Sequence, residues 1–347
     1  MNIYPYGHDF GNSETCGVLI VGDEHRSRCI PSVSYPANSQ GFSELGNKLG
    51  DGRYIYSDDE MELYMGDLAI DQSFSPDSSM GDINRYASHQ SRYFLLTVAA
   101  SLTDEREFGI HVVTGLPVLT FLGNPELRKA IPKALSGTYE FALNGKKRTI
   151  HVTVGQILME GASVLPHLGL KGDLLKAVID IGGRTTDLYV VRGQSPIEEL
   201  CRHGTMGVEL ALRSFNQRFE RKHGRELSSY ELKKLQESYV SSRRPDIPFM
   251  VDGIQVYGAM DILEQTMMEE GRKIVSFVSK RWNETETGKV ASSYDDVLII
   301  GGGAYYFGEM IQSRIRHARI VEQPEMANVE GYAMAAERLL YRRRVAS

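Results

Sequence analysis

Apolar residues along this chain follow two patterns, which predict two kinds of secondary structure. Short apolar runs, or alternation with polar residues, predict strands, whereas apolar positions three or four residues apart predict amphipathic helices. Both patterns recur through the sequence, so an α/β protein is expected. Ser228 and Glu231 fit the capping box that begins a helix. Helical spacing predicts helices over about 83–102, 208–219, 232–239, 263–278, 307–315 and 329–340.

The clearest strand pattern is a hairpin. Apolar residues alternate over 139–143 and over 150–154, on either side of Asn144-Gly145, which is typical of a tight hairpin turn. The strand that opens the chain is polar instead, so its edge of the sheet is expected to be partly exposed. Its alternating residues are Tyr4, Tyr6 and His8.

A turn rich in glycine and threonine joins two apolar strands at residues 176–191. Glycine lets backbone N–H groups approach phosphate oxygens, and hydroxyls add further donors. The carboxylate of Asp180, at the end of the first strand, suits Mg²⁺. Taken alone, the stretch also fits an ordinary β-hairpin. The turn residues are Gly182, Gly183, Arg184, Thr185 and Thr186.

The same order of residues occurs about half a chain length earlier. There Asp9 and Phe10 precede a turn made of Gly11, Asn12, Ser13, Glu14 and Thr15. The repetition favours phosphate binding over an ordinary hairpin. A third glycine turn follows the apolar strand at 297–300, although a tight strand-to-helix turn is the alternative for that stretch alone. Its residues are Gly301, Gly302, Gly303 and Ala304.

The order of phosphate turn, Glu160, phosphate turn and glycine triplet resembles the actin-type ATPase superfamily, and within it the ParM-like bacterial actins. The resemblance implies an α/β fold of two actin-like (ribonuclease H-like) domains with a nucleotide cleft between them. Each domain would be a mixed sheet flanked by helices, with an inserted subdomain. The domains are expected at 1–170 and 171–347, and the insertions at about 32–84 and 205–260. The C-terminal helix either stays with the second domain or packs back on the first.

The resemblance also implies roles for these residues. The two turns would hold the phosphates of ATP or ADP, and the glycine triplet with Ala304 would lie against the adenosine. Asp9 and Asp180 would hold Mg²⁺, largely through its water molecules. Glu160 would orient the attacking water, and Asp180 would share in catalysis. Taken alone, Glu160 also fits a solvated helix start.

One position departs from the family pattern. The family usually has a lysine directly after the threonine of the first turn, and this chain has Cys16. A cation that faces the phosphates is therefore missing there. Arg184, where the family tends to have a small residue, is a candidate replacement, and a solvent-facing Arg184 is the alternative.

Composition narrows the class of protein further. The 347 residues, 41% of them hydrophobic, suffice for two domains, and the net charge of −6 argues against a nucleic-acid-binding surface. Three cysteines without metal-ligand spacing argue against a disulfide framework or a zinc site. No apolar run is long enough for a membrane span, and the polar N-terminus is unlike a signal peptide. A cytoplasmic, reduced protein is expected.

The fold alone does not decide among the functions of this superfamily. We expect an ATPase that assembles with itself into nucleotide-dependent filaments and serves plasmid or DNA segregation. A DNA-binding adaptor protein would be its partner, without direct contact to nucleic acid or membrane. The alternatives are a small-molecule kinase and a non-polymerising nucleotide switch. A kinase would need an aspartate aimed at an acceptor hydroxyl, and no clear candidate stands out.

Overall fold

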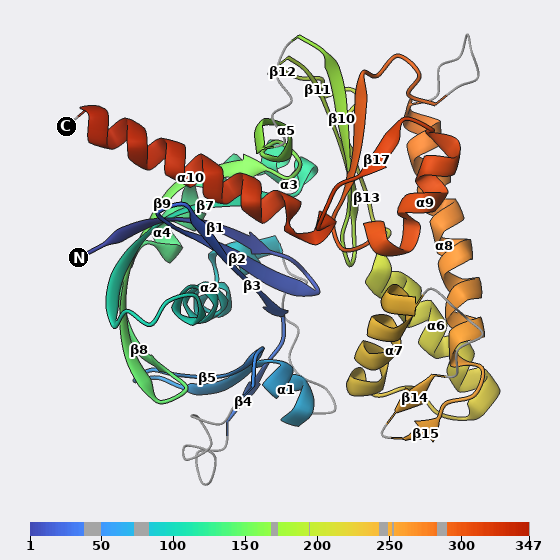
Figure 1. The fold of residues 1–347 in the computed structure, drawn as a ribbon, viewed down its shortest axis with the longest axis horizontal. Helices are drawn as coiled ribbons and strands as arrows, with labels where there is room; N and C mark the ends of the chain where they lie inside the picture. Colours follow the sequence, from blue (N-terminus) through green and yellow to red (C-terminus); the bar gives the residue numbers. More distant parts are fainter. Residues whose placement is uncertain are drawn as a thin grey trace. The chain divides into compact units, whose positions relative to one another are not determined.

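The computed structural model describes residues 1–37, 50–72, 83–167, 173–193, 195–242, 249–251, 253–282 and 290–346. The chain forms two compact units, each with its own sheet and hydrophobic core (Figure 1). The first unit comprises Met1–Leu170 and Met326–Ser347, and the second comprises Lys171–Glu325. The last helix of the chain therefore lies in the first unit.

The first unit is built on a mixed nine-stranded sheet in the order β3-β2-β1-β7-β9-β8-β5-β6-β4. Inside it, β1 is antiparallel to β2 and parallel to β7. The hairpin predicted at Asn144-Gly145 is confirmed as β8 and β9. The strands are β1 (Ile3–Phe10), β2 (Glu14–Val21), β3 (Glu24–Pro31), β4 (Ser34–Pro36), β5 (Arg53–Ser57), β6 (Glu62–Gly66), β7 (Glu107–Leu116), β8 (Gly137–Leu143) and β9 (Lys146–Met159).

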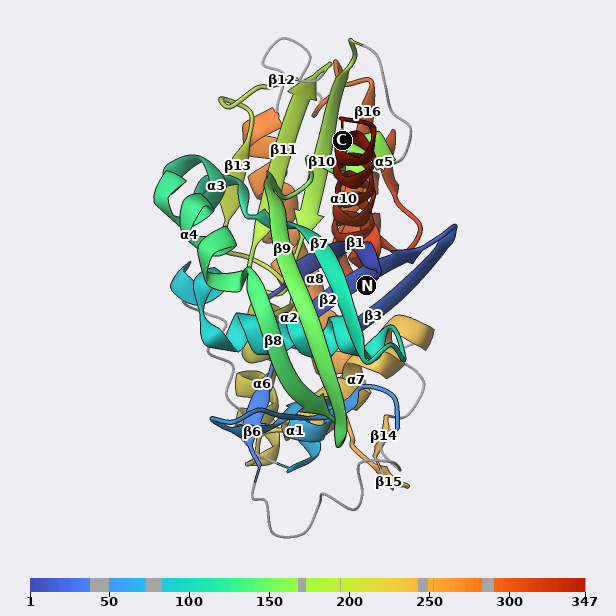
Figure 2. The same ribbon diagram turned by 90° about the vertical axis from the view of Figure 1, so that its left-hand side faces the viewer.

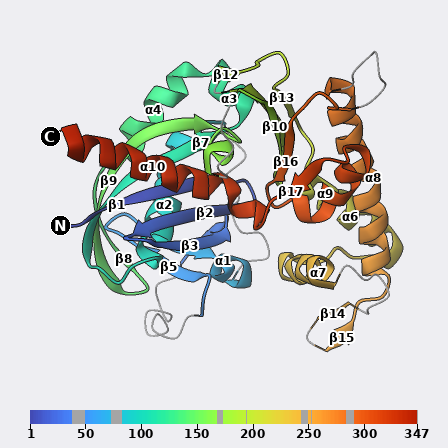
Figure 3. The same cartoon turned by 45° about the horizontal axis from the view of Figure 1, so that its top comes forward.

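Two helices cover opposite faces of this sheet. The sheet curves around α2 (His89–Ser101), which is buried on nearly all sides (Figures 1 and 3). On the other face, α10 (Ala327–Ala346) packs against β1 and β7 (Figure 3). Along β2, Leu19 joins the core around α2, whereas Val18 packs with residues of α10. The other helices are α1 (Asp67–Gln72), α3 (Val118–Gly123), α4 (Pro125–Leu135) and α5 (Val164–His167).

Two expectations for the first unit are wrong. The opening strand is not at an edge of the sheet, because β1 lies between β2 and β7. Tyr6 and His8 are fully buried and bond to each other, and Tyr4 is half-buried. The single long helix expected at about 83–102 is interrupted. A 3₁₀ helix, Ile83–Ala87, ends before Ser88, whose hydroxyl accepts from the Ser91 N–H at 3.2 Å and caps the start of α2.

The expected insertion at 32–84 contributes β4, β5, β6 and α1 to the first unit. The parts of it at 38–49 and 73–82 lie outside the described residues. The expected insertion at 205–260 contains α6, α7 and a two-stranded hairpin of β14 and β15 in the second unit. Asp252, the predicted turn residue of that hairpin, lies outside the described residues.

The second unit contains a smaller sheet in the order β12-β11-β10-β16-β17, with β13 paired to β11 (Figure 2). Its central strand, β10, is antiparallel to β11 and parallel to β16. The predicted capping box is confirmed: Ser228 Oγ accepts from the Glu231 N–H at 3.2 Å, and the Glu231 carboxylate accepts from the Ser228 N–H at 2.9 Å. The elements are β10 (Leu175–Ile181), β11 (Thr186–Arg192), β12 (Ser195–Pro196), β13 (Arg202–Gly204), α6 (Val208–His223), α7 (Ser229–Ser242), β14 (Met250–Val251), β15 (Ile254–Gln255), α8 (Ala259–Trp282), β16 (Asp296–Ile300), α9 (Ala304–Arg314) and β17 (Ala318–Ile320).

None of the helices in the described ranges has both the length and the apolar character needed to span a membrane.

Candidate functional site

The hairpins that carry the two predicted phosphate turns have the same register. In the first unit the turn closes at the pair Phe10 and Thr15, and in the second at the pair Ile181 and Thr186. Each turn therefore contains four residues, and the aspartate of each hairpin comes just before the closing pair. The two halves of the chain therefore contain the same structural element, a hairpin with an aspartate just before a four-residue turn.

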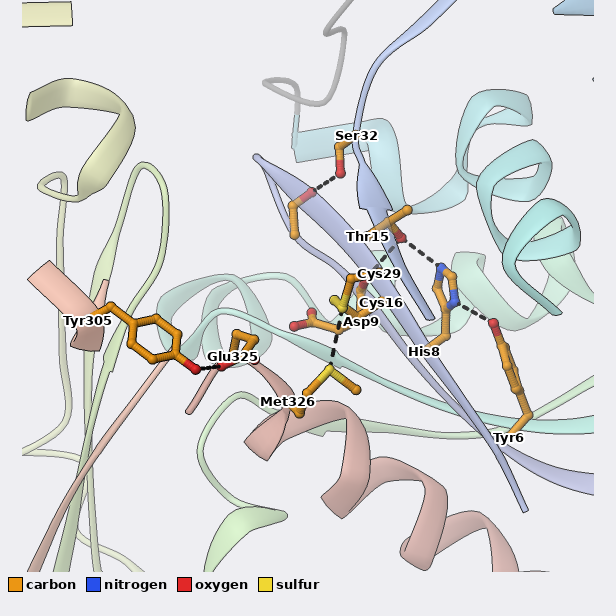
Figure 4. The surroundings of a disulfide bond; sticks show 11 residues. Tyr6, His8, Asp9, Thr15, Cys16, Cys29, Ser32, Tyr305, Glu325 and Met326 are labelled. Atoms are coloured by element: carbon orange, nitrogen blue, oxygen red, sulfur yellow. Dashed lines mark hydrogen bonds between the residues drawn. A yellow bond between two sulfur atoms is a disulfide. The ribbon is translucent and has the colours of Figure 1, made fainter. Parts of the chain in front are cut away.

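The first turn is fixed by the residue after β3. Ser32 donates its N–H to the Ser13 carbonyl at 2.9 Å and its hydroxyl to the Gly11 carbonyl at 2.8 Å (Figure 4). A Cβ at Gly11 would lie 2.2 Å from the Glu14 carbonyl oxygen, so this backbone path requires glycine. The protein itself thus holds the turn in shape.

A buried chain of polar groups runs from this turn into the sheet (Figure 4). Thr15 Oγ1 lies 3.0 Å from the Asp9 carbonyl oxygen and 3.1 Å from His8 Nε2. His8 Nδ1 lies 3.1 Å from Tyr6 Oη. Burial lowers the pKa of His8 to about 3, so the ring is neutral at physiological pH.

These distances assign the protons of the chain. The Thr15 hydroxyl donates to the Asp9 carbonyl, so neutral His8 donates from Nε2 to Thr15 and accepts from Tyr6 at Nδ1. The Thr15 hydroxyl therefore already donates one hydrogen bond and accepts another within the first unit. A phosphate at this turn would meet backbone N–H groups rather than that hydroxyl.

Asp9 and Glu160 both lie close enough to Tyr86 in the first unit for their charges to act on it. Burial raises the pKa of Asp9 to about 6, and the charge of Arg85 opposes the rise. Burial also raises the pKa of Tyr86, and the charges of Glu160 and Asp9 raise it further. Phe10 meets Tyr86 edge-on, with ring centres 6.3 Å apart. Two predicted site residues, one in β1 and one directly after β9, therefore lie near the same tyrosine.

The backbone at Glu160 is fixed by two neighbouring elements. Its N–H donates to the carbonyl of Leu116, at the end of β7, at 2.9 Å. Gly161 follows with a φ of 81°, and its N–H donates to Asn328 Oδ1, on α10, at 2.9 Å. Glu160 directly follows β9, as expected, but Gly161 begins a turn rather than a helix, and α5 starts only at Val164.

The second turn is fixed by the start of α6. The carbonyls of Gly182 and Gly183 accept from the N–H groups of Val208 at 3.2 Å and Glu209 at 2.7 Å. A Cβ at Gly207 would lie 2.5 Å from the Gly182 carbonyl oxygen, so this close approach also requires glycine.

Two side chains of the second turn are engaged within their own unit. Thr186 Oγ1 donates to the Met206 carbonyl at 2.9 Å, much as Thr15 does in the first turn. Arg184 pairs with Glu209 through Nε to Oε2 at 2.6 Å and Nη2 to Oε1 at 2.9 Å. Arg184 therefore has a carboxylate partner instead of facing solvent alone.

Asp180 lies beside the glycine triplet. β10 and β16 are parallel, with Asp180 opposite Ile300, so the triplet follows at the same end of the sheet. Gly301 has a φ of 80°, and a Cβ there would lie 2.5 Å from Asp180 Oδ1. The Gly303 N–H donates to the Ile181 carbonyl at 2.8 Å, whereas a Cβ at Gly302 would meet nothing within 4 Å. The second unit thus brings a carboxylate and an open glycine surface together.

The carboxylates of Asp9 and Asp180 suit a hydrated metal ion better than an ion bound directly by several side chains. Among the described residues, no group of three or more His, Cys, Asp or Glu side chains could hold a metal ion directly. Asp9 and Asp180 are single carboxylates, which suit an ion that keeps most of its water, as Mg²⁺ does.

Cys16 and Cys29 form a disulfide bond between β2 and β3, which contradicts the expectation of unpaired cysteines (Figure 4). The two residues are directly opposite in the antiparallel pair, with Cα atoms 4.1 Å apart. Only the strand register brings them together, and the spacing in the sequence does not reveal it. Cys16 also pairs with Asp9 across β1 and β2, so the position of the family lysine holds a neutral, bonded sulfur. Cys201 is free and buried.

Arg85 and Tyr86, which lie in the 3₁₀ helix beside the first turn, are not among the site residues predicted from the sequence. They belong to no glycine turn and follow no strand, and the sequence carries no other signal for them.

A mixed sheet flanked by helices, with an aspartate and a glycine-containing turn in one hairpin, occurs in each unit and defines the actin-like fold. Family models of actin-like proteins match both halves of the chain. Residues 7–162 match the N-terminal domain of actin like proteins, and residues 178–313 match the C-terminal domain of the MreB-like archaeal actin homologue. The chain belongs to the actin-like proteins.

Solved structures of this fold cover almost the whole chain. Ta0583, an archaeal actin homologue, has a TM-score of 0.74 at 19% identity, over 97% of this chain and 100% of its own. ParM from a 15-stranded filament of Clostridium botulinum has a TM-score of 0.75 at 18% identity, over 97% and 100%. Bacillus thuringiensis ParM with ATP has a TM-score of 0.71 at 16% identity, over 98% and 100%. The predicted two-domain actin-like fold and the resemblance to ParM are confirmed. No curated protein sequence matches the chain.

Proposed function

We propose that this protein is an ATPase that binds ATP with Mg²⁺ and assembles with itself into filaments. The observation that carries the proposal is the repeated turn: each unit places an aspartate just before a four-residue, glycine-containing turn. Glycine turns suit phosphate groups, and a carboxylate beside each turn suits a hydrated divalent cation.

The roles of the residues follow from their positions. Backbone N–H groups of the two turns would bind the phosphates, and Asp9 and Asp180 would hold the hydrated metal. Bound Mg²⁺ would neutralise charge on the phosphates. Glu160 would orient the attacking water, because its backbone is fixed and its charge, like that of Asp9, acts on Tyr86 beside the first turn. The open surface at Gly302 would lie against the nucleoside. Phosphoryl transfer depends mainly on such positioning and charge stabilisation.

Assembly is proposed from proteins of the same fold. The Clostridium botulinum ParM forms a 15-stranded filament, the Bacillus thuringiensis ParM was solved with ATP, and Ta0583 was solved in complex with ADP. We extend self-assembly to this chain, with a role in plasmid or DNA segregation, a DNA-binding adaptor as partner and a cytoplasmic location.

Calorimetry with ATP and Mg²⁺ tests the nucleotide site. Asp180→Asn should lower the affinity at least tenfold while the protein stays folded, because the change removes a charge without changing the shape of the side chain. Asp173→Asn, an exposed carboxylate of the same unit, should leave the affinity unchanged. Equal affinity of the wild type and a folded Asp180→Asn variant would refute the site.

A further inference from the structure

Arg85 is a buried cation whose hydrogen bonding is incomplete. It is only 7% exposed. Its Nη2 donates to Tyr86 Oη at 2.8 Å, and its guanidinium lies over the Tyr86 ring, 4.4 Å from the centre. Its Nη1 is buried and has no hydrogen-bond partner within the described ranges. A buried N–H group without a partner is unfavourable, so a ligand that completes its bonding would be bound favourably.

The backbone holds Arg85 beside the first phosphate turn. Its carbonyl accepts from the Ser88 N–H at 2.9 Å and from Ser91 Oγ at 2.5 Å, which joins it to the start of α2. The neighbouring Tyr86 packs against Phe10, the residue between Asp9 and the turn. The Arg85 charge is close enough to Asp9 to lower the pKa of that carboxyl.

The other two candidate positions for a phosphate-facing cation are unsuitable. Cys16 is bonded to Cys29 and carries no charge. Arg184 is ion-paired with Glu209 through Nε and Nη2, so its charge is already balanced by a carboxylate. Arg85, in contrast, lies near the Asp9 turn and keeps a donor unused.

We propose that Arg85 replaces the missing lysine and that its free Nη1 binds the γ-phosphate of ATP. The inference rests on the proposed nucleotide function. A planar guanidinium suits phosphate oxygens, and Tyr86 holds it in a fixed orientation through both the ring contact and the hydrogen bond.

Calorimetry with Mg²⁺ and either a non-hydrolysable ATP analogue or ADP tests this assignment. Arg85→Gln should lower the affinity for the analogue by about tenfold to a hundredfold, as expected for the loss of a charged hydrogen bond. The affinity for ADP should change by less than about threefold, because ADP lacks the γ-phosphate. Equal losses for the two nucleotides, or no loss, would overturn the assignment.

Arg92→Gln is the matched control. Arg92 also lies over tyrosine rings, 5.5 Å from the centre of Tyr93 and 5.1 Å from that of Tyr139, and its buried Nε has no partner in the described part of the chain. Its charge is not among those that shift the pKa of Asp9. Both affinities should therefore stay at the wild-type values, and a loss equal to that of Arg85→Gln would overturn the inference.

Three further outcomes also have a defined meaning. If Arg85→Gln does not fold, Arg85→Met, which keeps the length of the side chain without its charge, decides: a loss confined to the analogue supports the inference, and unchanged affinity for both nucleotides overturns it. If the wild type binds neither nucleotide, the proposed function fails, and this inference fails with it. If the wild type binds both and Arg85→Gln binds them equally well, only the inference about Arg85 fails.

Discussion

Arg184 and Glu209 form a two-point ion pair, with contacts of 2.6 and 2.9 Å, between the second turn and the first residues of α6. The pair is partly exposed, and such pairs contribute roughly 0–1 kcal/mol. We therefore predict that Arg184→Ala lowers the free energy of unfolding by about 0.5–1 kcal/mol and changes ATP and ADP affinities by less than about twofold. Denaturant unfolding and calorimetry check this, with Glu209→Ala as the partner variant. If Arg184→Ala selectively lost affinity for ATP, the prediction would be wrong and Arg184 would be a phosphate-binding residue.

Two glycines of the triplet should respond differently to alanine. At Gly301 a Cβ would lie 2.4 Å from the Ile181 carbonyl oxygen and φ is 80°, so Gly301→Ala should destabilise the protein by about 1–3 kcal/mol. At Gly302 nothing lies within 4 Å, so Gly302→Ala should keep its stability and lower only nucleotide affinity. Unfolding curves of the two variants test this. Equal stabilities would contradict the close approach at Gly301.

The disulfide should stabilise the first unit. It closes a loop with a sequence separation of 13, and such a loop corresponds to about 3 kcal/mol in the chain-entropy model. The double variant Cys16→Ser with Cys29→Ser should lose about 2–3 kcal/mol relative to the oxidised wild type. Reduced wild type is the control and should match the variant. Thiol titration of the unfolded, unreduced protein should find one free thiol, Cys201, and three free thiols would contradict the bond.

Asp9 should make the stability depend on pH. Its pKa in the folded protein, about 6, lies above its ordinary value of 3.8, so the fold favours the protonated carboxyl. That contribution is complete below about pH 4 and is lost as the pH rises through about 6. Asp9→Asn, which cannot ionise, should therefore be more stable than the wild type at pH 7.5 and equally stable at pH 4. Unfolding at both pH values checks this, and a variant less stable than the wild type at pH 7.5 would contradict it.

The sequence predicted the elements whose patterns are local. The hairpin at Asn144-Gly145 and the capping box of Ser228 and Glu231 need only neighbouring residues, and both are confirmed. The repeated order of residues from Asp9 and from Asp180 was also visible in the sequence, and the two hairpins that carry it have the same register in the structure.

Features that depend on distant contacts were not predictable. Tyr6 and His8 appeared exposed because they are polar, yet their mutual bond and the bond to Thr15 allow full burial. The disulfide depends on the register of β2 and β3. Arg85 acquires its surroundings only when the 3₁₀ helix packs beside the end of β1.

We propose that ATP hydrolysis, with Glu160 orienting the attacking water, controls the disassembly of the filament. The phosphates would be held mainly by other residues, so Glu160→Ala should bind ATP almost as tightly as the wild type. Its turnover should fall by about a hundredfold or more, because water orientation acts in the transition state. Asn328→Ala is a useful control, since it removes a support of the neighbouring Gly161 and leaves the carboxylate in place.

Light scattering and phosphate release, recorded on the same samples after ATP is added, test this claim most directly. For the wild type, scattering should rise and then decay as phosphate appears. For Glu160→Ala, scattering should rise to a similar level and persist while little phosphate is released. Sedimentation of the same samples shows whether polymer is present. No pelletable polymer with ATP and Mg²⁺, at any protein concentration up to tens of micromolar and in several salts, would contradict the account even if ATP were hydrolysed.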